Sequence, residues 1–133
     1  MKNLIITIFL TWNIASISAQ TNYDKIGQFG EYKSNWALVQ VGNKFGFINA
    51  KGKEIVKPIY DKIGSFEEYK SDWALVQVGN KFGFINDKGE EIVKPIYDKI
   101  GSFGEYKSDW AFVILNGKEG FIDTKGNFVF KNE

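Results

Sequence analysis

Hydrophobic and polar residues form short blocks along this chain, and the blocks return in the same order every 37 residues. In the middle copy, the aromatic and β-branched run 73–78 predicts a strand, and the run 81–86 predicts a second strand. Gly79 and Asn80 separate the two runs. A two-residue Gly-Asn link predicts a hairpin, because glycine supplies the positive φ that a tight turn needs.

The third copy indicates the register of this hairpin. A two-residue turn sets Gln77 opposite Phe82, and in the third copy these residues are replaced by Ile114 and Glu119. The apolar member of the pair has therefore moved to the other strand. Because opposed residues share one patch of a sheet face, we expect both pairs to be cross-strand neighbours.

A third strand is predicted over 90–97, after a turn at 87–89. Pro95 has no N–H to donate, so this strand should lie at a sheet edge or stop pairing near the proline. The segment 61–72 has no clean period and is predicted to be a connection, with a turn of helix at most and Ile63 and Phe66 under the sheet. No stretch carries a sustained helical stripe, so the sequence predicts an all-β domain.

The repeats determine the expected architecture. Copies 23–59, 60–96 and 97–133 follow without a gap, and the first two differ at only five positions. This predicts a tandem array of three antiparallel three-stranded β units, each burying its apolar face on its neighbour. A closed trefoil-like arrangement is the alternative. The divergent end of the third copy favours the open array, because solenoids need atypical terminal repeats.

The first residues are typical of a signal peptide. Lys2 precedes the apolar run 4–10, and small residues lead to Ala19, after which we place the cleavage. The run is shorter than the roughly 20 residues that cross a bilayer. Residues 1–19 are therefore predicted to be removed, and 20–133 to form the β domain. We expect a periplasmic, cell-surface or secreted protein with no stable membrane insertion after cleavage.

The amino-acid composition excludes several kinds of catalytic and binding site. The chain has no Cys and no His, which excludes disulfides, Ser-His and Cys-His catalysis, and zinc sites of the usual ligands. Without Lys2, sixteen lysines balance sixteen acidic residues, and arginine does not occur. Nucleic-acid binding relies on positive charge and on arginine, so we reject that role. The turn 86–90 lacks the alternating acidic ligands of a calcium loop, so we expect no metal and no cofactor.

Carboxylates remain as candidates for catalysis. Asp61 and Glu68 could form an acid pair of the kind that glycosidases use. The same pair recurs in the other copies, as Asp24 with Glu31 and Asp98 with Glu105. A catalytic site needs one copy of each group, so the triplication favours a turn or strand-end contact instead. We therefore expect no enzymatic activity.

Two sets of repeated aromatic residues are candidates for binding. The tyrosines of the polar connection are the best candidates for exposed contacts, although packing at the sheet edge is equally compatible with the sequence. The tryptophans begin their strands, where packing is favoured over stacking on a ligand. These residues are Tyr32, Tyr69, Tyr106, Trp36, Trp73 and Trp110. The mid-strand residues Phe47, Phe84, Phe121, Ile48, Ile85 and Ile122 are predicted to form the core.

Several blocks together resemble the WG-repeat family of bacterial proteins. They are Lys-Phe-Gly-Phe-Ile-Asn at 81–86, the Lys-Gly turn behind it, and the closing Pro-Ile-Tyr-Asp at 95–98. The chain departs from the Trp-Gly pair that names the family, because Phe45, Phe82 and Glu119 stand at its first position. The resemblance covers 23–133 and implies a tandem array of short antiparallel β units on exported or envelope proteins. It implies no defined ligand.

These observations lead to one expected function and one alternative. We expect an exported, non-enzymatic repeat scaffold that mediates protein–protein interaction at the cell envelope or outside the cell, because repeat surfaces suit extended contacts. The alternative is a carbohydrate or cell-wall binding module that uses the repeated tyrosines and tryptophans. The expected partner is thus an unknown protein or an envelope polysaccharide.

Overall fold

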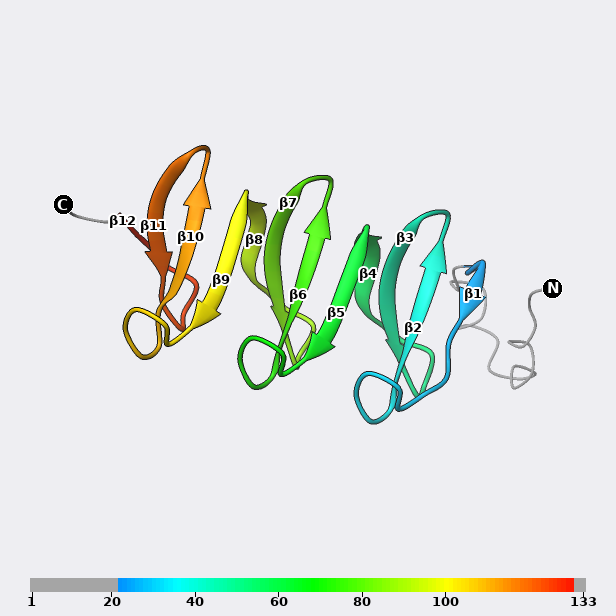
Figure 1. Ribbon diagram of the computed structural model, residues 1–133. Coiled ribbons are helices and arrows are strands. Elements are labelled where there is room, and N and C mark those ends of the chain that lie inside the picture. Colours follow the sequence, from blue (N-terminus) through cyan, green and yellow to red (C-terminus); the bar gives the residue numbers. More distant parts are fainter. Residues whose placement is uncertain (1–21, 131–133) are drawn as a thin grey trace.

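The computed structural model describes residues 22–130, which fold into three four-stranded antiparallel sheets (Figure 1). Unit 1 (22–60) holds β1 (Lys25–Ile26), β2 (Trp36–Val41), β3 (Lys44–Asn49) and β4 (Glu54–Tyr60). Unit 2 (61–97) holds β5 (Lys62–Phe66), β6 (Trp73–Val78), β7 (Lys81–Asn86) and β8 (Glu91–Tyr97). Unit 3 (98–130) holds β9 (Lys99–Phe103), β10 (Ala111–Leu115), β11 (Lys118–Ile122) and β12 (Phe128–Phe130).

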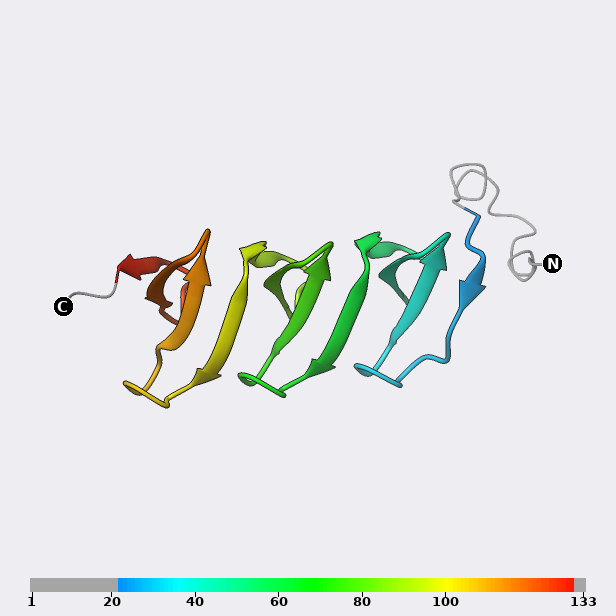
Figure 2. The same ribbon diagram turned by 45° about the horizontal axis from the view of Figure 1, so that its top comes forward.

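The three units stand in a row, with the first described strand, β1, and the last, β12, at opposite ends of the row (Figures 1 and 2). No sheet formed by residues 22–130 is closed. The prediction of an open, all-β array is therefore confirmed, and the closed trefoil-like alternative is wrong. The predicted cleavage after Ala19 lies outside the described residues.

Each unit has four strands, so the prediction of three-stranded units is wrong. The additional strand is the first one, which falls in the segment predicted to be a connection. Asp61 N–H donates to Gln77 O at 2.8 Å and starts the pairing of β5 with β6. The ladder then shifts register between Ile63 and Phe66. This irregularity breaks the alternation that would have indicated a strand.

The hairpin between the second and third strands has the predicted register. Gln77 pairs with Phe82, and Ile114 pairs with Glu119. Gly79 takes φ 60°, whereas in unit 3 both turn residues, Asn116 and Gly117, have positive φ values of 51° and 82°. Positive φ at both central residues is typical of the type I′ turn, and the Asn-Gly order favours it.

The edge position of the Pro95 strand is also confirmed. β8 pairs with β7 alone and forms the last strand of its sheet, so a missing N–H at Pro95 costs no ladder hydrogen bond on the free side. Only Asp61 separates β4 of unit 1 from β5 of unit 2, and Asp98 takes the same place between units 2 and 3. Each edge strand therefore leads directly into the first strand of the next sheet.

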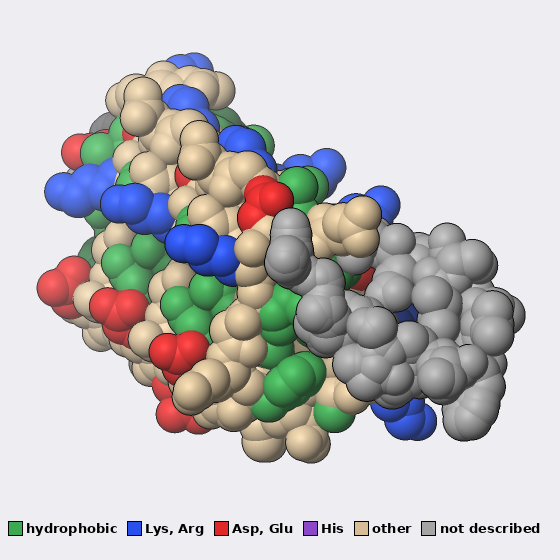
Figure 3. Space-filling view, turned by 90° about the vertical axis from the view of Figure 1, so that its right-hand side faces the viewer, with side chains coloured by type: hydrophobic (Ala, Val, Ile, Leu, Met, Phe, Trp, Pro, Cys, Tyr) green, Lys and Arg blue, Asp and Glu red, His purple; other side chains and the backbone are tan. Residues whose placement is uncertain are grey.

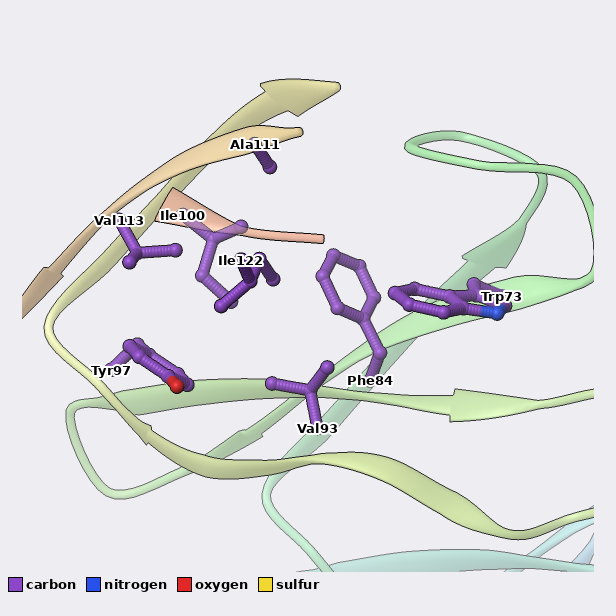
Figure 4. Close-up of a cluster of buried hydrophobic side chains, with 8 residues drawn as sticks. All are labelled: Trp73, Phe84, Val93, Tyr97, Ile100, Ala111, Val113 and Ile122. Atoms are coloured by element: carbon purple, nitrogen blue, oxygen red, sulfur yellow. The ribbon is translucent and has the colours of Figure 1, made fainter. Parts of the chain in front are cut away.

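The hydrophobic core lies between neighbouring units rather than inside one sheet. In Figure 4, Trp73, Phe84, Val93 and Tyr97 from unit 2 point toward Ile100, Ala111, Val113 and Ile122 from unit 3. The interface between units 1 and 2 repeats this arrangement with Trp36, Phe47, Val56, Tyr60, Ala74, Val76 and Ile85. An aromatic face therefore packs on an aliphatic face at both interfaces. The six residues predicted to form the core are all buried.

Candidate functional site

A polar loop joins the first and second strands of each unit, and the three loops lie on the same side of the array (Figure 1). They span 27–35, 67–72 and 104–110 and carry the candidate tyrosines. Each loop closes in the same way, as in unit 2, where Trp73 N–H donates to Lys70 O at 3.1 Å. Asp72 adopts φ 70° just before the strand, a conformation that Asn and Asp tolerate better than most residues.

The tyrosines differ in exposure along the array. Tyr32 packs edge-on against Phe47, with ring centroids 5.3 Å apart, and Tyr69 packs in the same way against Phe84. Both tyrosines are partly buried. Tyr106 instead lies flat on Phe121 at 4.5 Å and is 68% exposed. Each tyrosine thus covers a core phenylalanine, and Tyr106 leaves its outer ring face in solvent.

The tryptophans are packing residues in the first two units. Trp36 and Trp73 are only 8% and 6% exposed. Trp36 lies 5.2 Å from Phe47 of its own unit and 5.7 Å from Phe66 of the next unit. Trp110 is half-buried, because no described unit follows unit 3. A ligand can therefore reach a tryptophan ring only at this end of the described array.

A lysine from each loop lies over the tryptophan ring that follows it. The distances from Nζ to the ring centroid are 5.9 Å for Lys33, 5.5 Å for Lys70 and 4.3 Å for Lys107. A cation at this distance is attracted by the ring face. The loops therefore present Glu, Tyr and Lys side chains in the same order, and Lys33 also lies 5.3 Å from the Phe66 ring of the next unit.

A shallow hollow of about 420 Å³ lies beside the first loop. Glu31 and Tyr32 line it from unit 1, and Ser65 and Phe66 line it from unit 2. The hollow thus lies at the junction of two units and combines a carboxylate, a hydroxyl and aromatic rings. Its composition suits a polar side chain or a small polar group of a larger ligand.

Two aspartates of the candidate acid pairs, Asp61 and Asp98, form contacts between units. Gly79 N–H donates to Asp61 Oδ2 at 2.6 Å, and Lys44 Nζ lies 2.6 Å from Asp61 Oδ1. The Lys44 ammonium and the Gly79 N–H hold the pKa of the Asp61 carboxyl below its usual range. Asp98 makes the same contacts with Lys81 and Gly117. This confirms the expected structural role of the repeated aspartates.

Sequence reasoning missed a hydrogen bond at the first of these junctions, between units 1 and 2. Tyr60, the last residue of β4, donates its hydroxyl to the Glu91 carboxylate on β8. Burial and this hydrogen bond raise the pKa of the Tyr60 hydroxyl. At the next junction, Phe128 replaces the glutamate and packs 6.1 Å from the Tyr97 ring. The recurrence of Tyr23 with Glu54 and of Tyr60 with Glu91 in the first two copies was the available signal.

Charged side chains are sorted along the array. Figure 3 shows lysines in one line and acidic side chains in a second line below it, with hydrophobic side chains between them. Such lines follow from the repeat, because each unit places the same residue at the same height. The surface is therefore strongly patterned although the overall charge is nearly balanced.

Within residues 22–130, no three His, Cys, Asp or Glu side chains gather in a group that could hold a metal ion. In the same part of the chain, no helix is long and apolar enough to cross a membrane.

The fold and the repeated loops define the class, which is an open all-β repeat protein. The sequence model of the WG containing repeat matches residues 45–82 and 82–118. The chain therefore belongs to the WG-repeat family, as the resemblance predicted. Each matched repeat runs from the third strand of one unit to the start of the third strand of the next. Searches of curated proteins and of solved structures return no significant match.

Proposed function

We propose that this repeat protein is an exported, non-enzymatic scaffold that binds a protein partner along its row of loops. The observation that carries the proposal is the recurrence of one Glu-Tyr-Lys sequence in a loop of every unit, on one side of the array. A ligand with several attachment points can bind such a row by multivalency, so weak single contacts suffice.

The surface favours a protein partner over a polysaccharide. Sugar binding by stacking requires exposed aromatic faces, whereas Trp36 and Trp73 are buried and Tyr32 and Tyr69 are partly buried. Only Tyr106 among these residues offers a broad exposed face. Lines of both charges run beside hydrophobic side chains, which is the mixture that protein interfaces use. Carbohydrate binding remains the alternative because of Tyr106 and the polar hollow.

A side-by-side binding experiment tests the proposal. The product purified from cells that express the full chain is incubated with total envelope protein and with insoluble cell-wall polysaccharide. We expect a defined envelope protein to be enriched and no retention on the polysaccharide. Retention on the polysaccharide alone would replace the proposal with the carbohydrate alternative.

Two triple variants assign the binding to the loops. Glu31, Glu68 and Glu105 are all exposed, so their joint replacement by Gln changes the loops without opening the core. Joint replacement of Tyr32, Tyr69 and Tyr106 by Ala removes the rings, and circular dichroism checks that the product is folded. Single replacements should weaken binding modestly and triple replacements should abolish it, because the contacts add through avidity. Unchanged binding by both triple variants would contradict a role for the loops.

Export is tested separately. Cell fractionation and the intact mass of the product are measured after expression of the full chain. We expect a protein outside the cytoplasm whose mass corresponds to cleavage after Ala19. A full-length cytoplasmic product would contradict export and leave the binding experiment interpretable.

A further inference from the structure

The two ends of the described array carry complementary halves of the interface that joins neighbouring units. Between units 1 and 2, Phe66 lies 5.7 Å from Trp36 and 6.3 Å from Phe47. Between units 2 and 3, Phe103 lies 5.5 Å from Trp73 and contacts Phe84 in the same way. At both interfaces, the aromatic face of one unit thus receives a phenylalanine from the first strand of the next.

The hydrophobic residues at the two ends remain exposed. Ile26 and Phe29 in unit 1 correspond to Ile63 and Phe66 but are 40% and 48% exposed. At the other end, Tyr106 and Phe130 are 68% and 60% exposed, although Val93, the counterpart of Phe130, is buried. Besides these four, the large hydrophobic side chains exposed to a similar degree within residues 22–130 are Ile59 and Ile96. Exposed apolar surface is thus concentrated at the ends of the row.

The two ends also carry the two partners of the ion pair that joins neighbouring units, a lysine at one end and an aspartate at the other. Lys44 pairs with Asp61 across the first interface, and Lys81 pairs with Asp98 across the second. The lysine at this position of the third copy is Lys118, and the aspartate at this position of the first copy is Asp24. Both are exposed, and neither forms an ion pair within the described chain. Asp24 already accepts the Gly42 N–H at 2.6 Å, as Asp61 accepts that of Gly79.

The terminal units are only partly capped. Tyr106 and Phe112 cover Phe121, which replaces some of the cover that a following unit would provide. Trp110 is nevertheless half-buried, and the outer face of Tyr106 is open. In unit 1, Ala37, Val39 and Ile48 are buried in a cluster with Tyr23. The exposed hydrophobic surface at that end is therefore supplied by Ile26 and Phe29.

We propose that a second copy of this chain docks head to tail on the first. Ile26 and Phe29 of one copy pack on Tyr106 and Trp110 of the other, and Asp24 faces Lys118. This contact repeats the part of the inter-unit packing in which Ile63 and Phe66 meet the preceding unit, because the counterparts of the aliphatic face in unit 1 are already buried. Because the two surfaces differ, the interface is heterologous and propagates in a line rather than closing as a symmetric dimer. The inference goes beyond the binding function proposed above and does not depend on it.

Sedimentation velocity over a wide range of protein concentration tests the assembly, with protein that has never been denatured. We expect the weight-average sedimentation coefficient to rise with concentration. Phe29→Ser removes a hydrophobic contact from the docking surface of unit 1, and we expect it to weaken association by about tenfold or more. Ile59→Ser is the matched control, because Ile59 is 49% exposed but lies away from both ends. It should associate as the unchanged protein does.

Mixing two defective variants tests the head-to-tail geometry. Phe29→Ser disables the docking surface of unit 1. Tyr106→Ser combined with Lys118→Glu disables the docking surface of unit 3. At a concentration at which the unchanged protein associates, each variant alone should stay monomeric, and an equimolar mixture should form one-to-one complexes and nothing larger. Circular dichroism and urea unfolding check that each variant is folded. The proposal is overturned if the unchanged protein is monomeric at every concentration, if the mixture does not associate, or if Ile59→Ser weakens association as much as Phe29→Ser.

Discussion

Gly83, the glycine of the family's signature pair, occupies a position where β7 and β8 approach too closely for a side chain. A Cβ at Gly83 would lie 2.2 Å from Val93 O and 2.7 Å from Pro95 N. Since both are backbone atoms of β8, Gly83→Ala should displace the strand and lower the free energy of unfolding by about 3 kcal/mol. Urea unfolding followed by tryptophan fluorescence measures the loss. At Gly64 the nearest atom would be 3.6 Å away, so Gly64→Ala is the control. Equal losses in the two variants would contradict this explanation.

Glu67 is held in a backbone conformation that suits glycine. Its φ is 78°, and its counterparts Gly30 and Gly104 take 93° and 90°. A left-handed conformation costs a non-glycine residue about 1–2 kcal/mol, which exceeds the entropy that glycine loses on folding. Glu67→Gly should therefore stabilise the protein by about 1 kcal/mol, measured as a higher urea midpoint. Glu67→Ala removes the same charge but keeps the strain, so a gain of the same size in that variant would refute the argument.

At the scale of elements, the sequence allowed the hairpins to be predicted in register but not the first strand of each sheet. The swap of Gln77 and Phe82 for Ile114 and Glu119 revealed the pairing because opposed residues vary together. No such signal exists in β5, where Gly64 and a register shift interrupt the alternation. Ile63 and Phe66 were expected under the sheet, but they are only partly buried and pack on the preceding unit. That contact depends on an interface that local patterning does not encode.

The aspartates that link successive sheets should make stability depend on acidic pH. Asp61 and Asp98 have lowered pKa values through their lysine and N–H partners. Their contribution is complete above the unfolded pKa of about 3.9 and is lost as pH falls through the lower folded pKa. The urea midpoint should therefore drop below about pH 4 in the unchanged protein. The double variant Asp61→Asn and Asp98→Asn should lose stability at neutral pH and show a shallower drop.

The control for this titration is Asp72→Asn, because unit 1 already has Asn35 at the same place. This variant should follow the unchanged protein from neutral to acidic pH. If it flattens the profile as much as the double variant does, the acid sensitivity belongs to surface carboxylates in general rather than to the junctions between sheets.

At the scale of the whole molecule, the repeat predicts an open row but not which repeated residues are accessible. Tyr32 and Tyr106 have the same sequence neighbours, yet one is partly buried and the other is 68% exposed. The difference arises because unit 2 covers the aromatic face of unit 1, whereas no described unit covers that of unit 3. Position in the array therefore decides the environment of a residue as much as local sequence does.

An open row can be lengthened, and this property separates it from any closed arrangement. Inserting a second copy of 60–96 directly after Ile96 adds one unit and one more interface of the existing kind. Stability in such arrays is the sum of unit and nearest-neighbour terms, so the lengthened protein should be more stable. Its m-value in urea should rise by about a third, because the m-value scales with the surface exposed on unfolding. An insertion that leaves the m-value unchanged, or a chain that no longer folds cooperatively, would mean that the added unit does not join the row.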